Sequence, residues 1–234
     1  MNSASDAALK FDGTSARLVA TEINVYAASA EAPPPAVFDG PVNTSQPRIA
    51  DPLAGLEPPP LGPDRGAFSC TGGAHSLSPG YYPKGISMTG GNVTLEPGIY
   101  CLAGKGLNVA GGNLTAHGVM FYLLEGDKCC VNLTGNGIVD ITPLPLEMEP
   151  YGGIAIWQCR ENTNAATIRG TDQFSGIDGT LYFPKARVDI TGTSDNFGIR
   201  QLICDSVEIS GSGTVAINYD GRYPAPGTRV FLVK

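Results

Sequence analysis

The chain has 234 residues, 42% hydrophobic and only 16% charged, so it is long enough for one domain with a sizeable core. Its formal net charge of −7 argues against nucleic-acid binding, which needs a basic stripe, and against an anionic membrane surface. The 31 glycines and 19 prolines would suggest disorder if they were scattered, but the glycines recur at intervals. Composition therefore favours a packed, repetitive body.

The first part of the chain, residues 1–31, alternates apolar and polar side chains as a β-strand does. Leu9 and Phe11 form one such pair, and Ile23 and Val25 form another. We therefore expect residues 1–31 to form one or two opening coils of the repetitive body.

Residues 32–66 carry prolines too densely for a hydrogen-bonded ladder, as in the runs Pro33–Pro35 and Pro58–Pro60. Two interpretations stay open. This Pro-rich arm is either a linker between two domains or an excursion that lies along the flank of the body. In the second case four apolar side chains would pin it: Ile49, Leu53, Leu56 and Leu61.

The clearest repeat follows the arm. The segment Gly85–Thr94 recurs 21 residues later as Gly106–Thr115, and a looser copy lies at Val131–Ile138. Self-similarity at about 20 residues is typical of a solenoid. Within each copy, apolar residues alternate with small polar ones, and Gly-Gly, Pro-Gly and Asn-Gly pairs separate the strands.

These features predict an all-β fold, a single-stranded right-handed parallel β-helix (β-solenoid) in one domain, 1–234, with the arm packed outside. The main coils span 67–217, a second Pro-rich loop leaves them at 143–152, and residues 218–234 form a C-terminal cap. The prediction requires equivalent residues of successive copies to stack directly on one another. The residues that test it are Ile86, Leu107 and Val131.

Six cysteines form an even set without a Cys-x₂-Cys pair, so a zinc site is not indicated. We expect at least one disulfide and an oxidising compartment, with a connectivity that the sequence leaves open. In the adjacent pair, Cys129 and Cys130, one side chain should point inward and the other outward. The six are Cys70, Cys101, Cys129, Cys130, Cys159 and Cys204.

Three Asn-x-Thr triplets, which begin at Asn92, Asn113 and Asn132, also fit the glycosylation sequon. At this spacing we interpret them as a structural row of stacked asparagines at one corner, whose amides hydrogen-bond from coil to coil.

Aromatic side chains offer the candidate binding residues. Flat rings suit pyranose sugars, so an exposed row would make a sugar-stacking platform. The alternative, which we favour, is ordinary packing under the Pro-rich arm. The candidates are Trp157, Tyr82, Tyr122 and Tyr182.

Catalysis is the less favoured alternative, although β-helices do carry polysaccharide lyases and glycoside hydrolases. Such sites need clustered carboxylates. Asp178, and Asp189 beside Arg187, come nearest to that pattern, but isolated acids at turns usually bond local backbone N–H groups. His75 and His117 lack a partner at a suggestive spacing and are expected at turns or on the surface. We therefore assign no catalytic residue, metal or cofactor.

Five motifs occur in order across residues 8–217: Asp51–Leu56, Leu95–Tyr100, Gly118–Leu123, Tyr151–Ile154 and Gly179–Pro184. Together they resemble the extracytoplasmic region of TadG-type proteins of the Tad (tight adherence, Flp-type) pilus apparatus. The membrane anchor of that family is missing, and Ile154–Gln158 is less aromatic than its counterpart. The resemblance implies pilus assembly or adhesion and no chemistry.

Together these observations predict a non-catalytic bacterial protein of the periplasm or cell surface, a rigid rod that contacts a pilus or cell-envelope protein or a surface glycan. A secreted carbohydrate-binding module is the other alternative. The polar start, Met1–Ala4, is interpreted as the beginning of a trimmed segment from which an export signal or membrane anchor has been removed.

Overall fold

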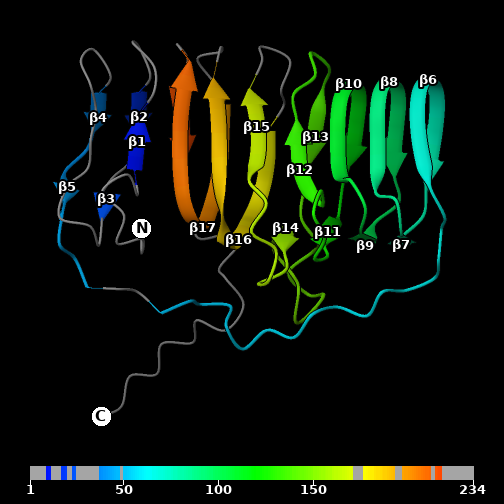
Figure 1. Ribbon diagram of the computed structural model, residues 1–234, viewed down its shortest axis with the longest axis horizontal. Coiled ribbons are helices and arrows are strands. Elements are labelled where there is room, and N and C mark those ends of the chain that lie inside the picture. The colour runs from blue at the N-terminus through cyan, green and yellow to red at the C-terminus, as the bar shows by residue number, and fades with distance from the viewer. Residues whose placement is uncertain are drawn as a thin grey trace.

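The computed structural model describes residues 9–11, 17–19, 23–24, 37–47, 50–170, 176–192, 197–211 and 214–217. Every strand pair in this part of the chain is parallel, and 16 strands join one continuous sheet. The sheet winds into a stack of coils, which Figure 1 shows side by side from β6 at one end to β4 at the other. The predicted β-solenoid is confirmed; its handedness stays a prediction.

Each coil has three faces. Face A begins each coil and is followed by face B, with several long strands bending from one to the other; face C closes the coil. The strands of faces A and B are β1 (Leu9–Phe11), β2 (Arg17–Val19), β4 (Val37–Asp39), β6 (Phe68–Leu77), β8 (Ile86–Leu95), β10 (Gly106–Ala116), β12 (Cys130–Leu133), β13 (Val139–Ile141), β15 (Ala166–Gly170) and β18 (Thr214–Ile217).

Face C consists of short strands and of the middle parts of two long ones. The short strands are β7 (Gly80–Tyr82), β9 (Gly98–Leu102), β11 (Val119–Leu123) and β14 (Ile154–Gln158). The long strands β16 (Gly176–Gly192) and β17 (Phe197–Gly211) run through faces B, C and A in turn. A separate two-stranded sheet pairs β3 (Ile23–Asn24) with β5 (Val42–Asn43).

The core is a set of apolar columns inside the coils. Ile86 pairs in register with Leu107, and Leu107 with Val131, so the stacking that the repeats predicted is confirmed. Alternation along each strand decides which residues face inward. The register then places the inward apolar side chains of one coil directly above those of the next. A second column of buried residues runs the same way through Cys70, Met88, Val109, Leu133, Ile168, Ile190 and Ile209.

Glycines turn the chain between faces A and B. Gly112 has a φ of +82°, and a Cβ there would lie 2.5 Å from the carbonyl oxygen of Gly91 in the coil below. Only glycine adopts that conformation at that approach without strain. The repeated Gly-Gly pairs of the sequence are therefore the corners of the coils.

The N-terminal strands lie at the far end of the stack. β1 pairs with β17, and β2 pairs with β18 on one side and with β4 on the other. The segment therefore does form coils, but these extend the C-terminal end of the solenoid instead of preceding β6. The predicted cap at 218–234 lies outside the described residues.

The Pro-rich arm returns the chain from that end to the start of β6 along the flank of the coils (Figure 1). Leu53 is only 1% exposed and Leu56 packs beside it, so the flank interpretation is confirmed and the two-domain linker is wrong. Leu61 is 43% exposed and does not pin the arm, contrary to the prediction. Ile49 lies outside the described residues.

The loop at 143–152 leaves the coils as predicted. Leu144 at its start is buried in the same cluster as Leu53, while Leu146 and Met148 at its tip are exposed. No helix in the described part of the chain is long and apolar enough to cross a membrane.

Candidate functional site

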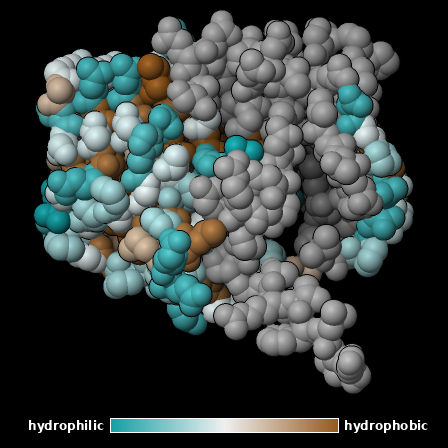
Figure 2. Space-filling model, turned by 180° about the vertical axis from the view of Figure 1, so that it is seen from behind, coloured by the Kyte–Doolittle hydropathy of each residue, from teal (hydrophilic) through white to brown (hydrophobic). Residues whose placement is uncertain are grey.

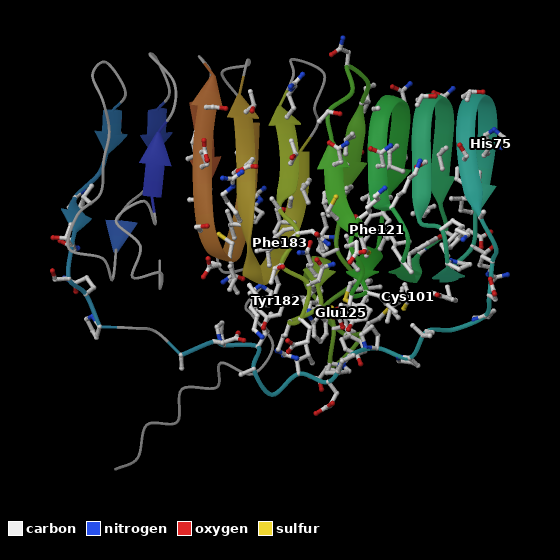
Figure 3. All side chains as sticks on the ribbon, in the orientation of Figure 1. His75, Cys101, Phe121, Glu125, Tyr182 and Phe183 are labelled. Atoms are coloured by element: carbon white, nitrogen blue, oxygen red, sulfur yellow. The ribbon has the colours of Figure 1, made fainter. Side chains whose placement is uncertain are left out.

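The outer side of face C carries an aromatic row. Its side chains share one column because each strand pairs in register with the next. The column runs through Tyr81, Cys101, Tyr122, Trp157, Tyr182 and Ile203. Figure 3 shows Tyr182 and Cys101 between the coils and the arm, whereas Phe121 and Phe183 lie within the coils.

The arm covers this row. Trp157 is fully buried and makes edge contacts with Tyr122 and Tyr182, at ring-centroid distances of 5.2 and 5.9 Å. Leu53 and Leu144 complete a second hydrophobic cluster outside the coils. The predicted sugar-stacking platform is therefore wrong, because no face of these rings is available to a pyranose, and packing under the arm is confirmed.

Tyr82 does not belong to that row. It points into the coils, where its ring stacks on that of Tyr100 at 5.8 Å and its hydroxyl donates to the carbonyl of Ser78 at 2.7 Å. Tyr82 shares a column with Leu102 and Leu123, and Leu123 directly follows Tyr122. Because successive residues of a strand point to opposite faces, Tyr82 and Tyr122 lie on opposite sides of the face C sheet.

Arg160 fastens the arm to the row. Its guanidinium donates to the carbonyl oxygens of Leu53 and Leu56 and lies 5.4 Å from the centre of the Trp157 ring. The Tyr182 hydroxyl donates to Asp51 Oδ2 at 2.5 Å, and burial with this carboxylate raises the pKa of Tyr182 well above its usual value. A cation held between carbonyls and aromatic faces is a strong, partly desolvated contact.

The six cysteines, all within the described residues, are free, so the predicted disulfide is wrong. Cys129 is buried and accordingly points inward, while Cys130 is half-buried, as the alternation predicted. Burial raises the pKa of Cys101 to about 11 and that of Cys129 to about 12. Both are therefore thiols, not reactive thiolates, at neutral pH.

The asparagines form two rows instead of one. Asn113 donates to Asn92 Oδ1 at 2.8 Å on face B, as predicted. Asn132 lies on face A and donates to Asn108 Oδ1 at 2.7 Å, so its assignment to the first row is wrong. Coil-to-coil amide bonding is confirmed, with Asn108 as the partner that the triplet motif missed.

The two aspartates singled out from the sequence, Asp178 and Asp189, form ion pairs with separate arginines. Arg200 Nε lies 2.7 Å from Asp178 Oδ1. Arg187 contacts Asp189 at 2.6 Å and Glu208 at 3.2 Å on face A. Within the described residues no three acidic, His or Cys side chains converge to hold a metal ion.

Both histidines are exposed, as predicted, but each has a contact. His117 Nε2 lies 2.8 Å from Asp140 Oδ2, a carboxylate partner that the linear spacing did not reveal. His75 packs edge-on against Phe68 with ring centroids 5.5 Å apart, at the β6 end of the stack (Figure 3). There it takes the inward position that Val93 occupies in the next coil.

The outer sides of faces A and B are polar. On face B the column runs from Ser76 through Thr94 and Thr115 to Asp140. Figure 2, which views the molecule from behind, shows hydrophilic and pale side chains over its described part, with hydrophobic ones scattered among them. The face A column consists of Ser69, Ser87, Asn108, Asn132, Thr167, Asp189 and Glu208.

A depression of about 660 Å³ lies at the corner between these two polar faces. It forms where the turn after β12 is longer than the Gly-Gly corner of the coil below. Thr134 and Asn136 of that turn line it, together with Arg169 of the next coil. The sequence did not single out this site, although the outward position of Arg169 follows from the buried Ile168 before it.

No known protein-family model, curated protein or solved structure matches this chain.

Proposed function

We propose that this protein is a non-catalytic scaffold of the bacterial cell envelope, which presents a regular polar ladder to a protein or glycan partner. The observation that carries the proposal is the pair of polar columns on faces A and B. Seven successive strands on face A and four on face B each contribute a polar outward side chain. Stacked strands hold such groups about 4.8 Å apart without further folding, which suits a partner with a repeating structure.

Two further features support a binding role over a catalytic one. The carboxylates of Asp178 and Asp189 are neutralised by arginines in separate ion pairs, whereas acid–base catalysis on polysaccharides needs two carboxylates facing one bond. The arm, held by Arg160, leaves faces A and B as the polar sides of the rod.

The setting that we propose is a Tad/Flp-type pilus assembly or adhesion system, outside the cytoplasm. It rests on the five ordered motifs, among them Leu95–Tyr100 and Gly179–Pro184. In the structure both motifs belong to face C and its turns, with β11 and β14 between them, so they describe how a coil is built.

A deletion strain complemented with variants tests this proposal. Thr94→Lys places a long cation in the face B column, whereas Thr163→Lys makes the same change at an exposed turn away from it. We expect the first to impair pilus display or adhesion and the second to leave both intact. Full activity of the deletion strain, or cleavage of a polysaccharide by the purified chain, would overturn the proposal.

A further inference from the structure

The corner depression differs from the rest of the polar surface in its charge. Among its nine lining residues only one is charged, Arg169, and four are glycines. Its volume falls within the ~300–1,000 Å³ of ordinary ligand pockets, but its lining is polar where such pockets are mostly apolar. The lining residues are Ala110, Gly111, Gly112, Asn113, Thr134, Gly135, Asn136, Gly137 and Arg169.

Arg169 stands apart from the other arginines whose side chains are described. Arg65 and Arg160 donate to backbone carbonyls, and Arg187 and Arg200 form ion pairs with acids. Arg169 is exposed and has no hydrogen bond or ion pair with any described residue. In a chain with a net charge of −7, this guanidinium is a local positive site with no acid in the depression beside it.

The floor of the depression is fixed. Asn113 donates to Asn92 and accepts the Ile138 N–H at 2.9 Å, so hydrogen bonds at both its nitrogen and its oxygen hold its side chain in place. Gly137 is packed so closely on Gly112 that a Cβ there would collide with the Gly112 backbone. The floor therefore closes against backbone, while the hydroxyl of Thr134 and the amide of Asn136 remain at the rim.

Arg169 lies beside these rim groups because of the strand register. Leu133, the last residue of β12, pairs with Ile168 of β15, so Thr134 and Arg169, which follow them in the chain, reach the same corner in neighbouring coils. A planar guanidinium binds a carboxylate through two parallel hydrogen bonds. Hydroxyl and amide groups next to it match the hydroxyls of a sugar ring.

We propose that this depression binds an acidic sugar residue of a polysaccharide, with its carboxylate on Arg169 and its hydroxyls on Thr134 and Asn136. The proposal rests on the glycan-contact form of the function proposed above and names its ligand class. Because the depression lies at the corner of two polar faces, a longer glycan can continue along either one.

Oligogalacturonate is a suitable probe, with its methyl ester as the uncharged counterpart and free galacturonate as the monomer. By titration calorimetry we expect the wild type to bind the acidic oligomer at least ~10-fold more tightly than the ester, since a charged hydrogen-bond partner is lost. The monomer should bind more weakly than the oligomer. Equal binding of monomer and oligomer would overturn the assignment to a polysaccharide.

Two variants test the role of the guanidinium. Arg169→Gln should weaken binding of the acidic oligomer at least ~10-fold and leave binding of the ester unchanged. Arg65→Gln, the matched control, removes an exposed arginine that donates to the Pro79 carbonyl and lies outside both polar columns, and should bind the oligomer like the wild type. Asn136→Asp should abolish the preference for the acidic oligomer over its ester, because the new carboxylate pairs with Arg169. Asn136 is exposed, so we expect this change to leave the free energy of unfolding nearly unchanged.

The outcomes separate this inference from the proposed function. No binding of the acidic oligomer, or equal binding by wild type and Arg169→Gln, overturns the acidic-sugar site. If Thr94→Lys still impairs adhesion in that case, the scaffold proposal stands without it. Release of shortened oligomers during the titration would instead overturn the non-catalytic role, whatever the effect of Arg169.

Discussion

The two sides of the coils are built differently. The outer side of face C carries aromatic residues under a strap that Arg160 fastens. The outer sides of faces A and B instead carry polar residues that are exposed or half-buried. These columns have the same strand geometry and spacing. The comparison shows that the stacked strands alone do not determine whether an outer face is buried or exposed. The side chains on that face determine it.

The strapped side should be the more sensitive to truncation. Trp157→Ala removes the largest fully buried side chain, so we expect a loss of about 3–5 kcal/mol in the free energy of unfolding, measured by urea denaturation. Trp157→Phe keeps a ring in the cluster and should lose less. Thr94→Ala on the open side should stay within about 0.5 kcal/mol. Equal losses at the two sides would contradict the distinction drawn between them.

The strap itself should depend on Arg160. Arg160→Gln removes the charged donor to Leu53 and Leu56 and its contact with the Trp157 ring. We expect a loss of about 2 kcal/mol and faster proteolysis or amide exchange within 51–61. The control is Arg187→Gln, in an exposed ion pair of the open side, which should lose less than about 1 kcal/mol. An arm that stays protected in Arg160→Gln would show that apolar packing alone holds it.

The open sides should depend on their corners instead. Gly112→Ala forces a Cβ against the Gly91 carbonyl at a positive φ, so it should destabilise the fold by more than about 1 kcal/mol. Gly72→Ala makes the same change in the terminal coil, where no atom lies within 4 Å of the added Cβ, and should be nearly neutral. Thermal unfolding of the two variants side by side measures the difference.

The strapped side should also give the stability a pH dependence. Burial raises the pKa of Cys101 to about 11 from 9.0, and the protonated thiol is the form that the fold favours. Its contribution to stability is therefore complete below the unfolded value of 9.0 and is lost as the pH rises toward about 11. Cys101→Ala should flatten the fall in urea midpoint over that interval. An unchanged slope would assign the fall to other groups.

The periodic part of this fold could be predicted from the sequence, because alternation reports which residues of a coil face inward. The stacking of Ile86, Leu107 and Val131 follows from it directly. The same alignment places Asn132 over Asn108, so the structural row was readable from register, whereas the triplet motif misassigned it.

Other features carry no periodic signal. Alternation gives the outward position of Trp157 but not the arm that covers it, because cover depends on a segment about 100 residues away in the chain. The depression at Arg169 likewise depends on how two turns of unequal length stack. The missing disulfide has a different cause: cysteines at inward positions such as Cys70 and Cys129 serve as small hydrophobic residues.

The return of the chain along its own flank has a consequence for how the protein is made. β1 is among the earliest strands to leave the ribosome, yet its partner β17 is among the last. The nascent chain must therefore keep β1, and the edge of β2 that pairs with β18, unpaired through most of translation, while the coils from β6 onward assemble one upon another. Closing this longest of its contacts is the step that we expect to set the folding rate.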